Sequence, residues 1–156
     1  MSQPGTERVQ QALREAGVDA QVVRLDKSAR TAQLAADAIG PTLGSIVKTL
    51  VFPADGERVL VLVAGDRKAD PAKLKDVTGA KRVMIADADR VREATGFSIG
   101  GVAPVGYAHR LPVWIDDSLG RFAQVYAAAG HPHAVVGIGY DDLVRVTTGQ
   151  VADVTK

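Results

Sequence analysis

The stretch SIVKTLVFPADGERVLVLVA, residues 45–64, decides the fold because it contains two strand-like runs with a turn between them. The runs cover 45–52 and 58–64, and the Pro-Ala-Asp-Gly sequence that separates them has the residues typical of hairpin turns. Residues 59–64 are apolar without alternation, so the second strand is expected to be covered on both faces. The stretch therefore predicts a β-hairpin with one buried strand.

The segments on either side of this hairpin alternate irregularly between helical and strand-like patterns. Helices are expected at 6–16, between Thr31 and Gly40, at 72–77 after the cap Asp70, at 87–94 and from Asp141; strands are expected at 20–25, 82–86, 111–116, 124–129, 134–138 and 150–154. Thr31 and Asp87 are suited to cap their helices, and Leu34, Ala35 and Ala38 form the expected buried face of the first of these. Irregular alternation with several hairpins predicts an α/β fold of the α+β type with a mixed sheet.

Composition limits the class of protein. The 156 residues suit one domain, 1–156, and the 46% apolar and 24% charged fractions are close to the globular average. A formal net charge of +1 falls short of the strongly basic balance of proteins that grip nucleic acid over a wide surface. The absence of cysteine excludes disulfides, thiolate catalysis and cysteine-ligated zinc.

The chain also carries no pattern typical of export or membrane insertion. Its first residues, MSQPGTERVQQ, are polar and lack the apolar core of a signal peptide. No apolar run approaches the length that spans a membrane. We therefore expect a cytoplasmic protein that does not engage a membrane.

Lys48 is the most informative charged residue. Strand alternation places it on one face with Ile46, Leu50 and Phe52, where an ammonium is unfavourable unless it reaches water or a partner. One interpretation is a snorkelling lysine that protects an edge strand from aggregation. The other is a cation that projects into a cleft and binds an anion or a carbonyl. The residues alone leave both open.

The second informative stretch is TGFSIGGVAPVG, residues 95–106, with four glycines and Pro104 among small apolar residues. Glycine permits positive φ and close approach of a ligand to the backbone, whereas proline fixes its own φ and restricts the residue before it. The loop is either a plain surface connection or a segment shaped to present backbone N–H groups. Composition favours neither.

Other polar groups give weak signals. Asp116 and Asp117 are more simply the start of a turn than a pair of catalytic carboxylates. His109, His131 and His133 have no cysteines or spaced carboxylates around them, so we expect solvated loop histidines and no metal or cofactor. The chain has no complete phosphate-binding or dinucleotide fingerprint and no nucleophile elbow, which leaves a covalent mechanism without a nucleophile.

The order of these features resembles the YbaK/prolyl-tRNA-synthetase-associated editing-domain family, whose free-standing members remove wrongly attached amino acids from tRNA. The resemblance spans nearly the whole chain, and its most specific parts are the lysine-bearing strand and the G-x-x-x-P loop. The matching segments are Val47–Val51, Ala80–Val83, Ala86-Asp87, Thr95–Phe97, Gly100–Gly106, Arg110–Pro112, Ile115-Asp116, Val125-Tyr126, Gly130 and Asp142–Asp153.

The resemblance implies a mixed, partly barrel-like sheet surrounded by short helices. It also implies hydrolysis of an aminoacyl ester without a protein base, in which a hydroxyl of the terminal ribose assists the attacking water. Lys48, Gly100 and Gly101 are the implied catalytic residues, the glycines through backbone N–H groups aimed at the developing oxyanion. The implied substrate-binding residues are Thr49, Val102, Pro104, Ala128 and Gly130.

The resemblance further places Ala127, Ala128, Ala129 and Val135 near the substrate. Because this stretch is apolar where cysteine-directed relatives carry hydroxyl or acidic groups, we expect a small amino acid such as alanine or 2-aminobutyrate rather than Cys, Ser or Thr. The expected carrier is tRNA(Pro) or a related tRNA. An editing site of this kind hydrolyses tRNAs that carry amino acids which the synthetase pocket fails to reject. Such an activity would serve translation fidelity.

The expected partner is the acceptor end of a mischarged tRNA, not DNA, because a 2′-hydroxyl is required. Rim candidates for RNA binding are Arg30, Lys68, Lys81 and Arg110. A synthetase or an elongation factor is a further candidate partner. The alternative function is a non-catalytic tRNA-binding or regulatory module on the same fold.

Overall fold

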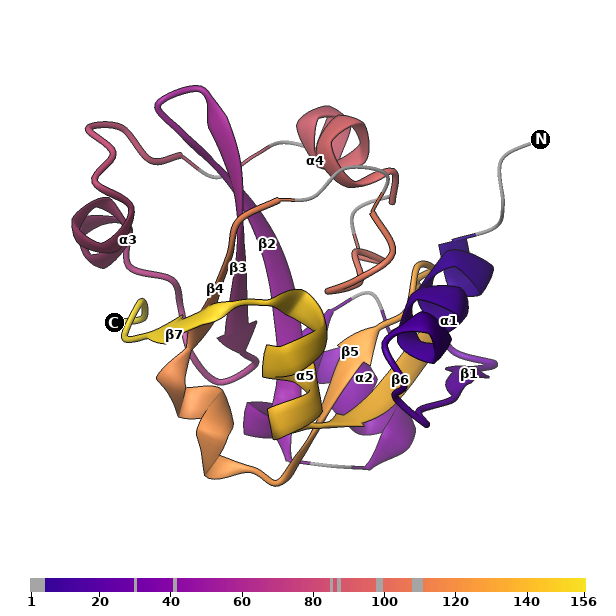
Figure 1. Ribbon diagram of the computed structural model, residues 1–156. Helices are drawn as coiled ribbons and strands as arrows, with labels where there is room; N and C mark the ends of the chain where they lie inside the picture. The colour runs from indigo at the N-terminus through magenta and orange to yellow at the C-terminus, as the bar shows by residue number, and fades with distance from the viewer. Residues whose placement is uncertain are drawn as a thin grey trace.

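A computed structural model describes residues 5–29, 31–40, 42–84, 86, 88–97, 100–107 and 111–156 (Figure 1). The helices in these ranges are α1 (Gly5–Glu15), α2 (Ala32–Ile39), α3 (Pro71–Thr78), α4 (Ala88–Thr95) and α5 (Tyr140–Thr147), with 3₁₀ turns η1 (Leu43–Ser45) and η2 (Asp117–Arg121). The strands are β1 (Val22–Arg24), β2 (Ile46–Ala54), β3 (Glu57–Ala64), β4 (Val113–Asp116), β5 (Gln124–Ala128), β6 (Ala134–Gly139) and β7 (Gln150–Ala152).

The strands form one seven-stranded sheet in the order β1-β6-β5-β2-β3-β4-β7. The pairs β1–β6, β6–β5 and β2–β3 are antiparallel, whereas β5–β2, β3–β4 and β4–β7 are parallel. The predicted mixed sheet with surrounding short helices is therefore confirmed.

The β2–β3 hairpin forms the centre of this sheet. Its register runs from Val47↔Ala64 to Ala54↔Glu57, so the turn is only Asp55-Gly56, with φ of 51° and 86°. Positive φ at both turn residues matches the right-handed twist of the strands. Residues 59–64 are all buried, which confirms a strand covered on both faces.

Different helices cover the two faces of the sheet (Figure 1). Leu60 and Leu62 of β3 pack in one core with side chains of α1, α4 and α5 and of the glycine-rich loop. Val61 and Val63 face the other way and pack with Leu74 of α3. On that second side α2 packs in a separate small cluster, to which it contributes Ala35 and Ala36.

Local signals set most helix ends as predicted. Thr31 Oγ1 accepts a hydrogen bond from Leu34 N at 3.1 Å, and Asp70 Oδ1 accepts one from Ala72 N at 2.9 Å. Gly40 and Gly79 end their helices in the left-handed conformation. The predicted cap Asp87 lies outside the described residues. Among the helices of the described ranges, none combines the length and apolarity needed to cross a membrane.

Three local predictions were wrong. The described residues of the 82–86 segment, 82–84 and 86, do not form a regular strand: Val83 makes an isolated bridge to Ala54, and Ala86 N donates to Val51 O at 3.0 Å. Among the side chains of α2 whose burial is described, Ala35 and Ala36 are buried, whereas Leu34 is 41% exposed, because the helix packs on a small cluster that contacts only part of the expected face. The last helix begins at Tyr140 with Gly139 as its cap, one residue before Asp141.

Candidate functional site

A cleft opens where β2 and β5 separate. β2 pairs with β3 from Val47 onward, but its other edge pairs with β5 only at Ile46 and Val47. Farther along that edge, Val51 O accepts from Ala86 N. Residues 48–50 lie between these two attachments, and no strand of the described residues pairs with them on that edge.

The cleft has a volume of about 320 Å³, near the lower limit of typical small-molecule sites. Its walls come from α2 and the segment before it, from β2, β5 and β6, from α4 and from the glycine-rich loop. The lining residues are Ala29, Thr31, Ala32, Ala35, Ile46, Val47, Lys48, Thr49, Leu50, Val91, Gly100, Val102, Tyr126, Ala127, Ala128 and Val135. Of the lining residues that the structure describes, Lys48 is the one that carries a charge.

The structure brings five of the eight predicted site residues to this cleft: Lys48, Thr49, Gly100, Val102 and Ala128. It thereby joins the lysine-bearing strand to a loop some fifty residues later in the sequence. Gly101, Gly130 and Pro104 do not line the cleft. Their roles as site residues stay predictions.

Lys48 is half-buried at the cleft, and its ammonium Nζ donates a hydrogen bond to Arg67 O at 2.5 Å. Burial lowers the pKa of this amine below its usual 10.5, and the nearby cation Lys68 lowers the pKa further, while Asp66 opposes the shift. Lys48 is thus a partly desolvated cation that a ligand carbonyl or anion would stabilise.

Thr49 lies beside Lys48 but on the opposite face of β2. Its Oγ1 is buried, and no hydrogen-bond partner for it occurs among the described residues. Because buried polar groups in folded proteins are almost always paired, an orphan hydroxyl in a cleft wall is a candidate ligand contact.

The glycine-rich loop reaches the cleft at Gly100, whose φ is 88°, and at Val102. Gly101 between them packs on the β5–β6 turn: its O accepts from Gly130 N at 3.0 Å, and a Cβ would lie 2.9 Å from His131 Cα. Gly130, with φ of 89°, is crowded in turn by the backbone of Gly5. Gly101 and Gly130 therefore hold the loop against this turn by close packing.

The loop is anchored beyond the cleft as well. Phe97 is buried and its ring meets that of Tyr107 edge-on at 5.9 Å, while the Tyr107 hydroxyl donates to Ala103 O. Burial raises the pKa of the Tyr107 hydroxyl. Pro104 lines a separate hollow of about 220 Å³ beside α5 and α1. Pro104 therefore belongs to the part of the loop that faces this hollow and does not line the cleft.

Several residues that line the cleft were not predicted from the sequence to belong to the site. Thr31, Ala32 and Ala35 enter the wall from α2, and Tyr126 enters from β5. Alternation along β5 places Tyr126 on the face of Ala128, which could have identified the tyrosine. The alanines of α2 look like any helix face, so their position depends on tertiary packing. The three hydroxyl residues Thr31, Thr49 and Tyr126 make the cleft less uniformly apolar than expected.

The β5–β6 turn links both walls of the cleft. Its Gly130 N donates to Gly101 O, and its Pro132 O accepts from Ala29 N at 2.6 Å. The predicted loop histidines lie here: His131 Nδ1 accepts from His133 N at 3.0 Å. Burial, Arg24 and His133 lower the pKa of His131. The His131 ring is therefore bonded within the turn, and His109 lies outside the described residues.

Of the predicted rim cations, Lys68 lies close enough to Lys48 to affect its pKa. Lys81 lies instead beside the β2–β3 hairpin, where its backbone N donates to Asp55 Oδ2 at 2.9 Å. Arg30 and Arg110 lie outside the described residues. The loop that carries Lys68 also pairs with the C-terminal residues, since Asp70 N donates to Val154 O and Lys156 N donates to Lys68 O.

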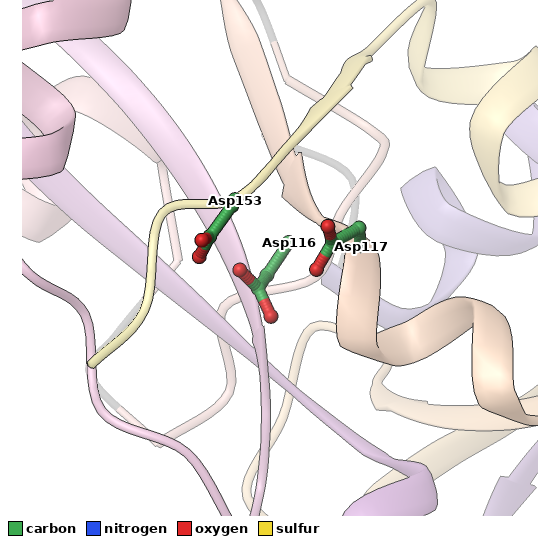
Figure 2. A group of neighbouring side chains, drawn as sticks. All are labelled: Asp116, Asp117 and Asp153. Atoms are coloured by element: carbon green, nitrogen blue, oxygen red, sulfur yellow. The ribbon is translucent and has the colours of Figure 1, made fainter.

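Asp116, Asp117 and Asp153 form an acidic cluster away from the cleft, with one oxygen of each within 4.8 Å of the others (Figure 2). Asp116 is fully buried and accepts hydrogen bonds from Val154 N, from the backbone and hydroxyl of Ser118 and from the hydroxyl of Thr155. Asp153 pairs with Lys73 at 2.9 Å. These bonds account for the cluster as a structural connection between β4, η2 and the residues after β7, in line with the predicted turn.

Comparison with known proteins identifies a family and several relatives that this chain resembles. The profile of the aminoacyl-tRNA editing domain matches residues 26–146. YwhH of Bacillus subtilis is 36% identical over 86% of this chain and 87% of its own length. EbsC of Enterococcus faecalis, named as a Cys-tRNA(Pro)/Cys-tRNA(Cys) deacylase, is 25% identical over 80% of this chain and 77% of its own.

Prolyl-tRNA ligases match over a shorter stretch. The ligase of Moorella thermoacetica is 41% identical over 46% of this chain, which spans only 12% of the ligase. A crystal structure described as a trans-editing enzyme for prolyl-tRNA synthetase superposes with a TM-score of 0.92 and 39% identity, covering 100% of this chain and 99% of that one. On these matches, the chain belongs to the aminoacyl-tRNA editing domain family.

Proposed function

We propose that this protein is a trans-editing deacylase that hydrolyses the ester of a mischarged tRNA, with alanine or 2-aminobutyrate on tRNA(Pro) as the preferred substrate. The observation that carries this proposal is the cleft between β2 and β5, which joins Lys48 and the glycine-rich loop in one small, mostly apolar space. One relative is named as a deacylase, and one similar structure is described as a trans-editing enzyme for prolyl-tRNA synthetase. Both names support hydrolysis of an aminoacyl-tRNA ester as the reaction.

The chemistry of the cleft favours attack by water over a covalent mechanism. Its lining contains no His, Asp or Glu that could serve as a general base among the described residues. The Oγ1 of Thr31 is already used to cap α2. Water adds to the ester carbonyl with help from the ribose hydroxyl, and the carbon–oxygen bond to the ribose breaks to give the free amino acid and the tRNA hydroxyl.

The protein then contributes position and charge. Lys48 binds the ester carbonyl or the terminal phosphate, and the backbone N–H groups at Gly100 and Gly101 stabilise the developing oxyanion. Since Gly101 does not line the cleft, Gly100 is the stronger of the two candidates.

The walls of the cleft set the size of the amino acid. Ala29, Ala35, Ala128 and Val135 are small or branched and offer no charged group to a polar side chain. Each methylene excluded or accepted by such a wall changes selectivity by a factor of about 10 to 200. The proposal therefore favours alanine and 2-aminobutyrate over Cys, Ser and Thr.

A panel of tRNA(Pro) charged with Ala, 2-aminobutyrate, Cys, Ser, Thr and Pro tests this function. We expect the highest kcat/KM for Ala and 2-aminobutyrate and no hydrolysis of Pro-tRNA(Pro). Faster cleavage of Cys- or Ser-tRNA would contradict the substrate assignment. Binding of the acceptor end without turnover of any member would support the alternative, a non-catalytic tRNA-binding module.

The same panel, repeated with prolyl-tRNA synthetase or an elongation factor added, tests the further partners. A rise in specificity for tRNA(Pro) when either protein is present would support a partner that selects the tRNA. Binding that weakens as salt rises is expected because the contact is to phosphates.

A further inference from the structure

We propose that the gap between β2 and β5 is a subsite for the α-ammonium group of the aminoacyl ester, and that Thr49 is its specificity-determining residue. The inference rests on the proposed function, because its ligand is the aminoacyl end of that substrate. Beyond that function, the subsite specifies the α-ammonium as the recognised group and names the protein atoms that bind it.

The first acceptor of this subsite is the main-chain carbonyl of Thr49. Along a β-strand, the N–H and C=O of one residue point to the same edge, and successive residues alternate. On β2, Val51 O accepts from Ala86 N and Pro53 O accepts from Met84 N, so odd-numbered residues face away from β3. Thr49 follows the same alternation and faces the cleft.

The second acceptor is the main-chain carbonyl of Ala128. Ala129 N donates to β6, so odd-numbered residues of β5 face β6 and Ala128 faces β2. The β2–β5 register ends at Val47↔Ala127. Continuing this ladder would require a bond from Thr49 N to Ala128 O, so the strands separate just before that bond forms.

The third acceptor is the buried Oγ1 of Thr49, which has no hydrogen-bond partner among the described residues. Leaving a buried hydroxyl unpaired is unfavourable, so a ligand that pairs with it gains affinity. Two carbonyls and one hydroxyl from adjoining positions match the three donors of an ammonium group.

The subsite and Lys48 differ in the charge of the ligand group that each would bind. The described lining of the cleft has no carboxylate, so an ammonium would be recognised by neutral acceptors alone. The Lys48 side chain projects from the other face of β2 and is held by Arg67 O. The substrate would thus place its ammonium at Thr49 and its negative or carbonyl groups toward Lys48, which fixes the direction of the ester in the cleft.

A pair of esters that differ only in the recognised group tests the subsite. Alanyl-tRNA carries the ammonium and lactyl-tRNA carries a hydroxyl in its place. With each rate divided by the spontaneous hydrolysis of the same ester, we expect wild type to prefer alanyl-tRNA in kcat/KM by roughly tenfold to a hundredfold, as for a hydrogen-bonded charge.

The variants are Thr49→Val, which keeps the shape and removes the hydroxyl, and the control Thr49→Ser, which keeps the hydroxyl. Thr49→Val should reduce the alanyl preference by roughly tenfold, and Thr49→Ser should retain it. Thermal melting checks that both variants fold. An equal wild-type preference for the two esters, or an unchanged preference in Thr49→Val, would overturn the subsite.

Binding of non-hydrolysable amides separates this inference from the proposed function. The probes are the alanyl and lactyl amides of 3′-amino-3′-deoxyadenosine, with Kd measured by calorimetry. We expect wild type to bind the alanyl amide more tightly and Thr49→Val to lose most of the difference. Preferential binding by a wild type that hydrolyses no ester would refute the deacylase and support the subsite, whereas equal Kd values would refute the subsite.

Discussion

The neighbouring strands β2 and β3 pair over eight positions and yet differ in what surrounds them. β3 has β2 on one edge and β4 on the other, and residues 59–64 are buried on both faces. β2 loses its second neighbour after Val47, and residues 48–50 are only half-buried at the cleft.

This difference separates stability from function along two adjacent strands. Residues 59–64 of β3 are paired with β2 and buried, so they present no side chain to a ligand. Beside the interrupted edge of β2, Lys48 contributes a half-buried cation and Thr49 a buried hydroxyl that has no hydrogen-bond partner among the described residues. The candidate site therefore lies where the sheet is incomplete.

The largest expected effect concerns β3. Leu62→Ala should lower the free energy of unfolding by about 2–5 kcal/mol, because Leu62 is fully buried and truncation leaves a cavity. Deacylation per folded molecule should not change. Urea unfolding and single-turnover assays measure the two quantities. The control Val151→Ala, at a side chain 47% exposed on the edge strand β7, should change stability by less than about 0.5 kcal/mol.

Lys48→Ala is the matching change on β2, and it should reduce activity while leaving stability unchanged. We expect kcat/KM for the preferred ester to fall roughly a hundredfold or more, as for removal of a group that stabilises the transition state. Melting temperature should stay close to that of wild type. Lys75→Ala, which removes an exposed cation of α3 that is not among the described lining residues, is the control. Unchanged turnover in Lys48→Ala would remove this lysine from the site.

The glycines that hold the loop give a smaller effect on stability. Gly130→Ala should destabilise the fold by about 1–3 kcal/mol because its Cβ would lie 2.5 Å from Gly5 C. Gly40→Ala is a matched control: its φ of 85° is nearly the same as the 89° of Gly130, but no atom lies within 4 Å of its Cβ. The difference between the two in urea unfolding isolates crowding from backbone strain. Equal losses would show that crowding is unimportant.

The smallest effect is a change in the pKa of Lys48. Burial and Lys68 both lower this pKa from 10.5, so Lys68→Ala should raise it and Asp66→Asn should lower it further. Because the folded pKa lies below the unfolded one, the charged amine opposes folding, and this opposition fades as pH rises through the folded pKa. NMR titration of the lysine side chain measures the shift. A pKa that is insensitive to both variants would contradict the charge coupling.

The sequence predicted those parts of the fold that depend on local patterns. The hairpin turn expected at 53–56, the uninterrupted apolar run at 59–64 and the cap at Thr31 each depend on a few neighbouring residues. Each was confirmed, although the strands extend farther than expected and shorten the turn to Asp55-Gly56. The segment 82–86 and the buried face of α2 were wrong because their structure depends on what packs against them. Pairing with the edge of β2 determines the first, and a cluster of small residues determines the second.

The candidate site was predictable only in part for the same reason. Lys48 was conspicuous because it is charged within an apolar run, and Gly100 belongs to an unusual loop. Nothing in the sequence indicates that β2 and β5 part after Val47, or that the Thr49 hydroxyl is buried without a hydrogen-bond partner among the described residues. The contribution of α2 likewise appears only once the chain has folded.

The pairing between the C-terminal residues and the loop that holds Lys48 has a consequence for local opening. Asp70 N and Lys156 N both bond across this contact, and Val154 N is bonded in turn to the buried carboxylate of Asp116. The loop that carries Arg67 O thus cannot move outward alone; the last residues must detach first. Amide hydrogen exchange at Asp70, Val154 and Lys156 should therefore report one shared opening event, a cooperative unit that joins the rim of the cleft to the end of the chain.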